Sequence, residues 1–180
     1  MKPYIICTLP YTEISAGIMV LWKLSQALYE KFPDKVFVVD KNQGPFSIPV
    51  FDQCKEPLQD CIAIYPEVVT GNPINAGTVV RYLLNLPSVI GGPLFFPETD
   101  MMFVYSAFFN RRMNYHPDRI LKVPYLEYER FQDFHQKREG SLYFRGKGIV
   151  SNVPKAEDIG GSKLFEGAEG QKLLISKLNK

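Results

Sequence analysis

The carboxylate of Glu67 is the first candidate for chemistry in this sequence, because it stands two residues beyond a short apolar run. That run, residues 61–65, predicts a buried strand. Open α/β sheets bind ligands at the carboxyl ends of their strands, so Glu67 could accept a proton there or hold a ligand hydroxyl. Two other roles are open for it: capping the helix predicted next in the chain, or pairing with Arg81.

The segment after Glu67 adds polar groups at the same place. Residues 70–73, Thr-Gly-Asn-Pro, predict a loop, which makes Asn72 a candidate for ligand contacts. Beyond this loop a helix is predicted over residues 75–85, ended by Pro87 and a pair of glycines. We expect Arg81 to be helical, partly exposed and close to Glu67 or another acidic residue. The helix is predicted by apolar residues at the spacing of one helical face: Val79, Val80, Leu83 and Leu84.

A loop near the start of the chain is a second candidate site. An apolar strand is predicted at residues 3–9, and a helix from about residue 17 to residue 32 with Ser15 as its cap. Ser15, Ala16 and Gly17 therefore bring a glycine and backbone N–H groups to a helix start, which suits a phosphate or carbohydrate oxygen. The loop lacks the several glycines of a dinucleotide fingerprint.

Two basic stretches could bind anions. Arg111 and Arg112, beside Phe108 and Phe109, could hold an anion or stack on a sugar ring, or they could be solvated at a strand-to-helix edge. In the run Gly146-Lys147-Gly148, glycine allows close backbone approach and lysine supplies a point charge, which suits a phosphate. The alternative for this run is a flexible basic linker.

Composition narrows the function classes. The 21 basic and 19 acidic residues give a net charge of +2, which offers no reason to propose nucleic acid. The three cysteines have no zinc-site spacing and are typical of reduced thiols in a cytoplasmic protein. His116 and His135 lie in unrelated settings, so no metal is predicted. No apolar run approaches the length of a membrane span.

The order of the predicted elements indicates an α/β fold. Strands are predicted at residues 36–39, 48–51, 101–105 and 120–123, in addition to the two described above. Their alternation with helices favours a Rossmann-like, mainly parallel sheet with helices on both faces and the first strand placed centrally. The residues expected to be buried in this sheet are Ile5, Ile6, Ile62, Ile64, Phe103 and Val104.

Residues 65–92, YPEVVTGNPINAGTVVRYLLNLPSVIGG, resemble a segment found in a group of bacterial and viral glycosyltransferases of the two-Rossmann (GT-B) type. The most specific part is VVRYLLN at residues 79–85, followed in order by the proline and the double glycine. Ser88 stands where the family usually has glycine. A weaker resemblance extends over about residues 3–150, and the last thirty residues are not covered.

The resemblance implies a division of the chain. Residues 1–140 would form the N-terminal, acceptor-side Rossmann-like domain of a GT-B enzyme, with residues 141–180 as the start of a truncated second domain or a tail. In the family, a short strand ending in Gly-Lys-Gly opens the second domain, which holds the sugar nucleotide. Only 32 residues follow Gly148, whereas a second domain needs about 100. We therefore expect that half to be missing from this chain or to be supplied by another protein.

The function implied is transfer of a sugar from a nucleotide-sugar donor to an acceptor hydroxyl, with negligible activity of this chain alone. Glu67 would be the catalytic residue, residues 15–17 would approach the donor phosphates, and Asn72 and Arg111 would contact the acceptor. The partners would be a carbohydrate or glycoconjugate acceptor and a nucleotide sugar, which is a co-substrate and not a bound cofactor. The sequence leaves open whether two copies of the chain associate through the surface left bare. The alternative is a non-catalytic Rossmann-like module that binds a ligand or partner.

Overall fold

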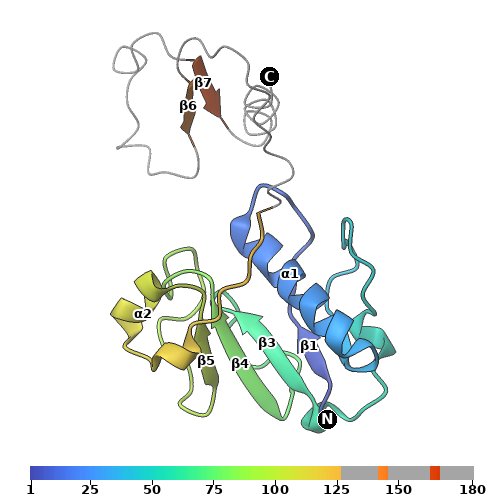
Figure 1. Ribbon diagram of the computed structural model, residues 1–180. Helices are drawn as coiled ribbons and strands as arrows, with labels where there is room; N and C mark the ends of the chain where they lie inside the picture. The colour runs from blue at the N-terminus through green and yellow to red at the C-terminus, as the bar shows by residue number, and fades with distance from the viewer. Residues whose placement is uncertain (127–141, 146–162, 167–180) are drawn as a thin grey trace. The chain divides into compact units, whose positions relative to one another are not determined.

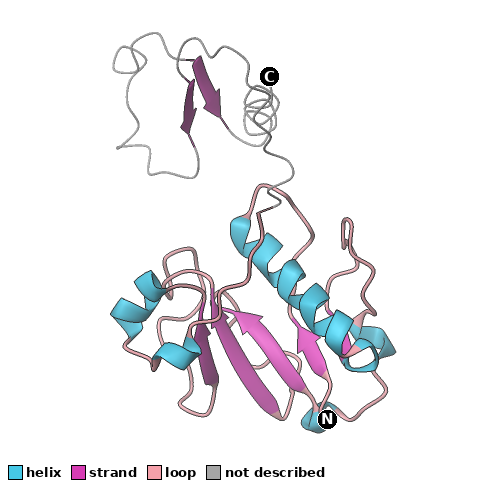
Figure 2. Cartoon of the chain, in the orientation of Figure 1, coloured by secondary structure: helices cyan, strands magenta, loops and turns pink. Residues whose placement is uncertain are grey.

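The computed structural model describes residues 1–126, 142–145 and 163–166 of the 180-residue chain. The chain divides into two compact units, Met1–Tyr125 and Leu126–Lys180, which are treated separately below. Figure 1 labels most of the helices and strands, and Figure 2 colours the chain by secondary structure. In the second unit, β6 (Leu142–Arg145) and β7 (Lys163–Glu166) pair in parallel.

A five-stranded, all-parallel sheet forms the centre of the first unit, and it confirms the predicted Rossmann-like α/β fold. The spatial order is β2-β1-β3-β4-β5. The first strand therefore has a neighbour on each side, while the third strand occupies the middle. The strands are β1 (Tyr4–Ile6), β2 (Val36–Val38), β3 (Ile62–Pro66), β4 (Thr78–Leu83) and β5 (Met101–Val104).

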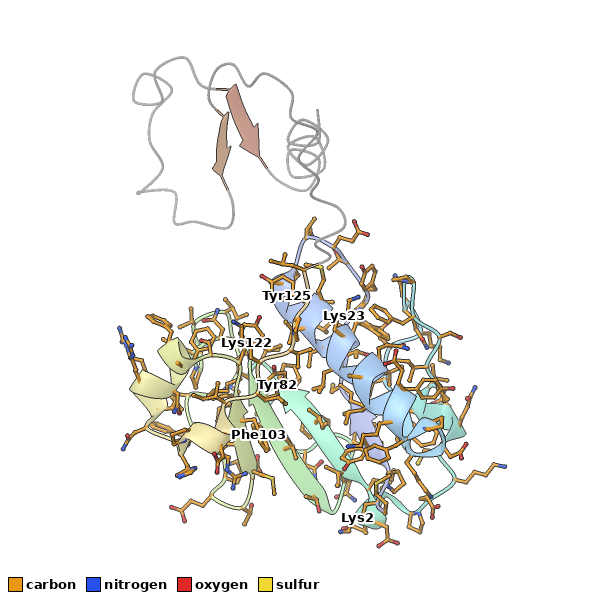
Figure 3. The ribbon with its side chains drawn as sticks, viewed as in Figure 1. Lys2, Lys23, Tyr82, Phe103, Lys122 and Tyr125 are labelled. Atoms are coloured by element: carbon orange, nitrogen blue, oxygen red, sulfur yellow. The ribbon has the colours of Figure 1, made fainter. Side chains whose placement is uncertain are left out.

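Side chains alternate between the two faces of this sheet, as the pleat of a strand requires. Tyr82 and Phe103 are partners in the register of β4 and β5, and Figure 3 shows them next to each other on the face that α1 covers. Most of the predicted core is confirmed, since Ile5, Ile6, Ile64 and Val104 are buried. Ile62 and Phe103 are only half-buried, because the first begins its strand and the second lies on the edge strand β5.

The helix α1 (Ala16–Lys31) confirms the prediction for this stretch and covers one face of the sheet (Figure 1). It buries Val20, Leu21, Trp22 and Leu24 in a cluster with side chains of β1, β2, β3 and β4. Trp22 also donates its indole N–H to the carbonyl of Leu9 at 2.9 Å and stacks on Phe46. These contacts join the helix to the segments that follow β1 and β2.

The helix predicted over residues 75–85 is wrong, because this stretch forms β4. Its core, Val79 to Leu83, is a continuous run of β-branched, aromatic and long side chains, and such a run fits a buried strand as well as a helical face. Asn75 has φ 59, and a Cβ on Gly77 would overlap the carbonyl of Gln59, so the chain before β4 follows a turn instead. Backbone pairing with β3 on one side and with β5 on the other stabilises the strand conformation of this run.

Several shorter elements complete the first unit. The predicted strands at residues 48–51 and 120–123 are reduced to single bridges, Val50 with Val38 and Ile120 with Val104. Residues 106–115 contain the helix α2 (Ala107–Met113), whose first turn is capped by the hydroxyl of Ser106. The 3-10 turns are η1 (Pro33–Lys35), η2 (Phe51–Gln53), η3 (Leu58–Asp60) and η4 (Pro117–Arg119).

Candidate ligand-binding edge

The carboxyl edge of the sheet contains a topological switch point between β1 and β3. The connection that leaves β1 runs through α1 to β2 on one side, whereas the connection that leaves β3 runs to β4 on the other side. Ligands of open α/β sheets bind where two neighbouring connections diverge in this way. The first residues beyond these two strands include Thr8 and Glu67, and both are buried.

Glu67 crosslinks the ends of β3 and β4 through backbone N–H groups. Its Oε2 accepts a hydrogen bond from the N–H of Leu84 at 2.9 Å, and only 2% of the residue is exposed. Burial raises the pKa of this carboxyl above its ordinary value, and bonds from the N–H groups of Leu84, Glu67 itself and Asn85 oppose the rise. Neither predicted alternative holds, since no helix follows directly and Arg81 pairs elsewhere.

The turn around Gly92 explains why Glu67 is so well covered. Gly92 has φ 81, a left-handed conformation that favours glycine. A Cβ at this position would lie 2.5 Å from the carbonyl oxygen of Glu67 and 2.6 Å from the Cα of Val68. The loop that follows β4 therefore folds back against the end of β3. The double glycine, expected to end a helix, instead allows this close backbone approach.

The start of α1 reaches the same place. Ser15 occupies the N-cap position, although its side chain makes no capping bond to the helix. A Cβ on Gly17 would lie 3.6 Å from Cδ1 of Leu84, the residue whose N–H binds Glu67. The structure thus brings together two of the predicted sites, residues 15–17 and Glu67, at the segment that follows β4. First-turn N–H groups of a helix and a carboxyl group are combined at one sheet edge.

Thr8 closes this edge on the side of β2, and sequence reasoning missed it. Its hydroxyl oxygen accepts a hydrogen bond from the N–H of Asp40 at 3.2 Å, and Asp40 in turn accepts from the N–H of Asn42 at 2.7 Å. The N–H of Tyr11 donates to the carbonyl of Asn42 at 2.8 Å. The loops after β1 and β2 are therefore joined. A polar residue directly after an apolar strand was the available signal.

Arg81 is neither helical nor partly exposed, as it lies in β4 with 1% of its surface exposed. An acidic partner was expected, and the structure shows that it is Asp100, at 2.7 Å between Nε and Oδ2. The other guanidinium nitrogens donate to the carbonyls of Val69, at 2.8 Å, and Gly71. The rings of Tyr65 and Phe96 lie within 4.9 and 5.2 Å of the guanidinium carbon. Each guanidinium nitrogen is therefore bonded to the protein, and Arg81 holds the loop after β3 against the sheet.

Asn72 organises its own loop. Its Oδ1 accepts from the hydroxyl of Tyr65 at 2.8 Å and from the N–H of Ala76 at 3.1 Å, and its Nδ2 donates to the carbonyl of Ala76 at 2.8 Å. The Tyr65 hydroxyl also accepts from the N–H of Ile74 at 3.0 Å. The amide predicted to contact an acceptor is thus engaged in holding residues 72–76 against β3.

The basic candidates fall in different parts of the chain. Arg111 lies exposed in the last turn of α2, next to the edge strand β5 and not at the switch point. Gly146, Lys147 and Gly148 lie outside the described residues. Within the described part of the chain, no group of three or more His, Cys, Asp and Glu side chains could hold a metal ion.

Comparisons with known proteins returned no matching family model, no matching curated protein and no matching solved structure. The fold and the edge therefore define a class, a Rossmann-like α/β protein with its candidate site at a switch point. Among the described helices, none has the length and apolar character needed to cross a membrane.

Proposed function

We propose that the unit Met1–Tyr125 is the acceptor-side domain of a GT-B glycosyltransferase, which transfers a sugar from a nucleotide sugar to an acceptor hydroxyl. The observation that carries this proposal is the convergence of Glu67 and the α1 N-terminus on Leu84, at the switch point of a parallel sheet. Phosphoryl groups are bound by helix N-termini, and proton transfer is performed by carboxyl groups, so one edge supplies both requirements. The resemblance of residues 65–92 to this enzyme class supports the same function.

Within this proposal the N–H groups of the first turn of α1, at residues 15–17, receive oxygens of the donor diphosphate. The helix dipole favours the charge that develops on the leaving diphosphate. Glu67 is the proton acceptor for the attacking hydroxyl. Its raised pKa supports this role, because a base with a pKa closer to neutrality transfers protons more efficiently.

The second unit supports a bipartite enzyme. Its described strands, β6 and β7, form a parallel pair, and parallel pairs joined by a crossover are the building blocks of Rossmann domains. Gly146-Lys147-Gly148 follow β6 directly in the sequence. We assign most of the contacts with the nucleotide to this second unit, which leaves the acceptor to the first.

A non-catalytic ligand-binding module is the second candidate, and the burial of Glu67 favours it. A carboxyl group that is 2% exposed and bonded to backbone N–H groups acts as a structural crosslink unless substrate binding uncovers it. The variant Glu67→Gln separates the two functions. Glutamine can still accept the N–H of Leu84, but it cannot take a proton, and loss of a general base costs about 10²–10⁴-fold in rate.

Nuclear magnetic resonance titration of the isotope-labelled 180-residue chain tests where ligands bind. Uridine, guanosine and thymidine diphosphates and candidate acceptor sugars should shift the amide signals of residues 15–17 and of Leu84 and Asn85. The diphosphates should bind no more tightly than about millimolar, because a few neutral hydrogen bonds of about 0.5–1.5 kcal/mol fall short of the approximately 8 kcal/mol of micromolar affinity. Sugar transfer by this chain alone should be negligible.

The variant Gly17→Trp should abolish the shifts by filling the space beside Leu84, whereas Ala27→Trp on the exposed side of the same helix should not. Shifts confined to α2 or to the amino edge of the sheet would contradict the proposed site. Micromolar binding of a diphosphate that is lost in Gly17→Trp would assign the donor site to the first unit.

A further inference from the structure

Two of the three cysteines lie side by side, far from the carboxyl edge in the topology of the sheet. The Sγ atoms of Cys54 and Cys61 are 4.0 Å apart, and both thiols are free. Cys54 directly follows η2, and Cys61 directly follows η3 and precedes β3. The pair therefore stands at the amino end of the middle strand, whereas the proposed ligand site lies at its carboxyl end.

The two cysteines differ in access and in how firmly they are held. Cys61 is 0% exposed, its carbonyl accepts the N–H of Thr78 in β4, and its own N–H donates to the carbonyl of Leu58. Cys54 is half-buried and is followed by the exposed residues 55–57. One thiol is thus fixed by the sheet while the other stands on a surface turn.

The turn between them is itself anchored. Lys35 of η1 forms an ion pair with Glu56 at 3.1 Å, and the N–H of Gly77 donates to the carbonyl of Leu58 at 3.0 Å. The turn between the two cysteines is therefore held at Glu56 and Leu58 while the sulfurs remain in contact. Closure to a bonded distance of about 2.05 Å requires side-chain rotation and a small shift of the exposed turn.

We propose that Cys54 and Cys61 form a reversible intrachain disulfide when the protein meets a hydroperoxide. The thiolate of Cys54 attacks one oxygen of the peroxide, the O–O bond breaks, and the sulfur is oxidised to a sulfenic acid; the hydroxide that leaves takes up the proton lost by the Cys54 thiol and becomes water. The thiolate of Cys61 then attacks the Cys54 sulfur, the S–S bond forms, and hydroxide leaves and takes up a proton as a second water. Overall, two thiols and one hydrogen peroxide give one disulfide and two waters.

The surroundings determine the order of attack. Cys54 is the thiol that a peroxide can reach, and Cys61 is covered by the protein. Burial and the adjacent Cys54 thiol raise the pKa of Cys61 to about 11, so this residue is a thiol at neutral pH and reacts second. Cys7, which directly follows β1, is also a free cysteine and serves as the internal reference.

The disulfide would close residues 54–61 into a short loop at the amino end of β3. Crosslinks of this kind stabilise mainly by restricting the unfolded chain. We therefore expect the oxidised protein to unfold at a higher temperature than the reduced protein. The ligand edge should be unchanged, because Glu67 and the start of α1 lie beyond the other end of the strand.

The test is peptide mapping of the wild-type chain after treatment with one equivalent of hydrogen peroxide. Free thiols are blocked with N-ethylmaleimide, and the protein is digested with trypsin without reduction. Lys55 separates the two cysteines, so the disulfide links the tryptic peptides 42–55 and 56–81, while Cys7 falls in a third peptide. The expected result is the linked pair, its release by dithiothreitol, and N-ethylmaleimide on Cys7.

Two variants complete the test. Cys61→Ser should accumulate the sulfenic acid or higher oxides on Cys54, and Cys7→Ser should form the linked pair as the wild type does. The oxidised wild type should also melt at a higher temperature than its reduced form, a difference that Cys61→Ser should lack. Recovery of both Cys54 and Cys61 as N-ethylmaleimide adducts, a link to Cys7, or a link between chains would overturn the proposal.

Discussion

The two sides of the sheet are covered by different means. On the side of α1, a helix packs apolar side chains against Ile6, Ile64 and Tyr82. On the other side, the connection from β3 to β4 is a loop. Its apolar side chains Val69, Ile74 and Ala76 join a small cluster on the sheet, and side-chain hydrogen bonds within this region also hold the loop in place. A helix satisfies its own backbone, whereas a loop over a sheet must be given partners for its N–H and C=O groups. The loop-covered face should therefore tolerate substitutions less well than the helix-covered face.

The largest loss of stability is expected for Arg81→Met. The substitution leaves the buried carboxylate of Asp100 without its cation and removes the donors to Val69 and Gly71. Removing one partner of a buried ion pair costs about 3–5 kcal/mol in the free energy of unfolding. Chemical denaturation measures this loss, and Arg111→Met on the exposed surface of α2 is the matched control, with an expected change within about 0.5 kcal/mol.

The double variant Arg81→Met with Asp100→Leu should recover part of this loss, because no unpaired charge remains buried. Arg81→Lys should rescue poorly, since one ammonium group cannot reproduce the fork of bonds to a carboxylate and two carbonyls. A loss below about 1 kcal/mol for Arg81→Met would show that the loop-covered face does not depend on this residue.

A smaller loss is expected for Asn72→Ala on the same face. Alanine removes the acceptor for the Tyr65 hydroxyl and both bonds to Ala76. Leaving a buried polar group unsatisfied costs about 1–3 kcal/mol. The double variant Tyr65→Phe with Asn72→Ala should then cost less than the sum of the single variants, because the two residues share one network. Strict additivity would contradict the network.

On the helix-covered face, Ile6→Val should cost about 0.5–1.5 kcal/mol, the range for loss of one buried methylene. Ile6 is 0% exposed and belongs to the apolar cluster, and its side chain has no polar group, so the substitution leaves no hydrogen-bond partner unpaired. Chemical denaturation measures this loss of stability as well. A loss equal to that of Arg81→Met would remove the difference between the faces.

The smallest effect concerns Glu67 and appears as a pH dependence. Its pKa in the folded protein is raised from 4.5, so the folded state binds this proton more tightly than the unfolded state does. The corresponding stabilisation is fully present below pH 4.5 and is lost as the pH rises through the folded-state pKa. Glu67→Gln should flatten the decrease in stability over this pH range. An unchanged pH profile in the variant would assign the decrease to other groups.

Much of the first unit could be predicted from the sequence, because its apolar runs are bounded by turn residues. The strands β1, β2, β3 and β5 and the helix α1 each follow from such a local pattern. The alternation of these elements along the chain also determined the fold class, since parallel strands require crossovers between them. The position of Glu67 just beyond β3 also follows from the local sequence, because the residue stands two residues beyond the apolar run of that strand.

Only the tertiary structure decided what the remaining residues do. The run at β4 fits a helix or a strand by its own pattern, and hydrogen bonds from β3 and β5 settled the choice. The same long-range pairing brought Arg81 within hydrogen-bond distance of Asp100, nineteen residues away, and gave Glu67 the N–H of Leu84 in place of a helix or an arginine. Contacts of this kind depend on which segments the sheet brings together, and local propensity carries no information about them.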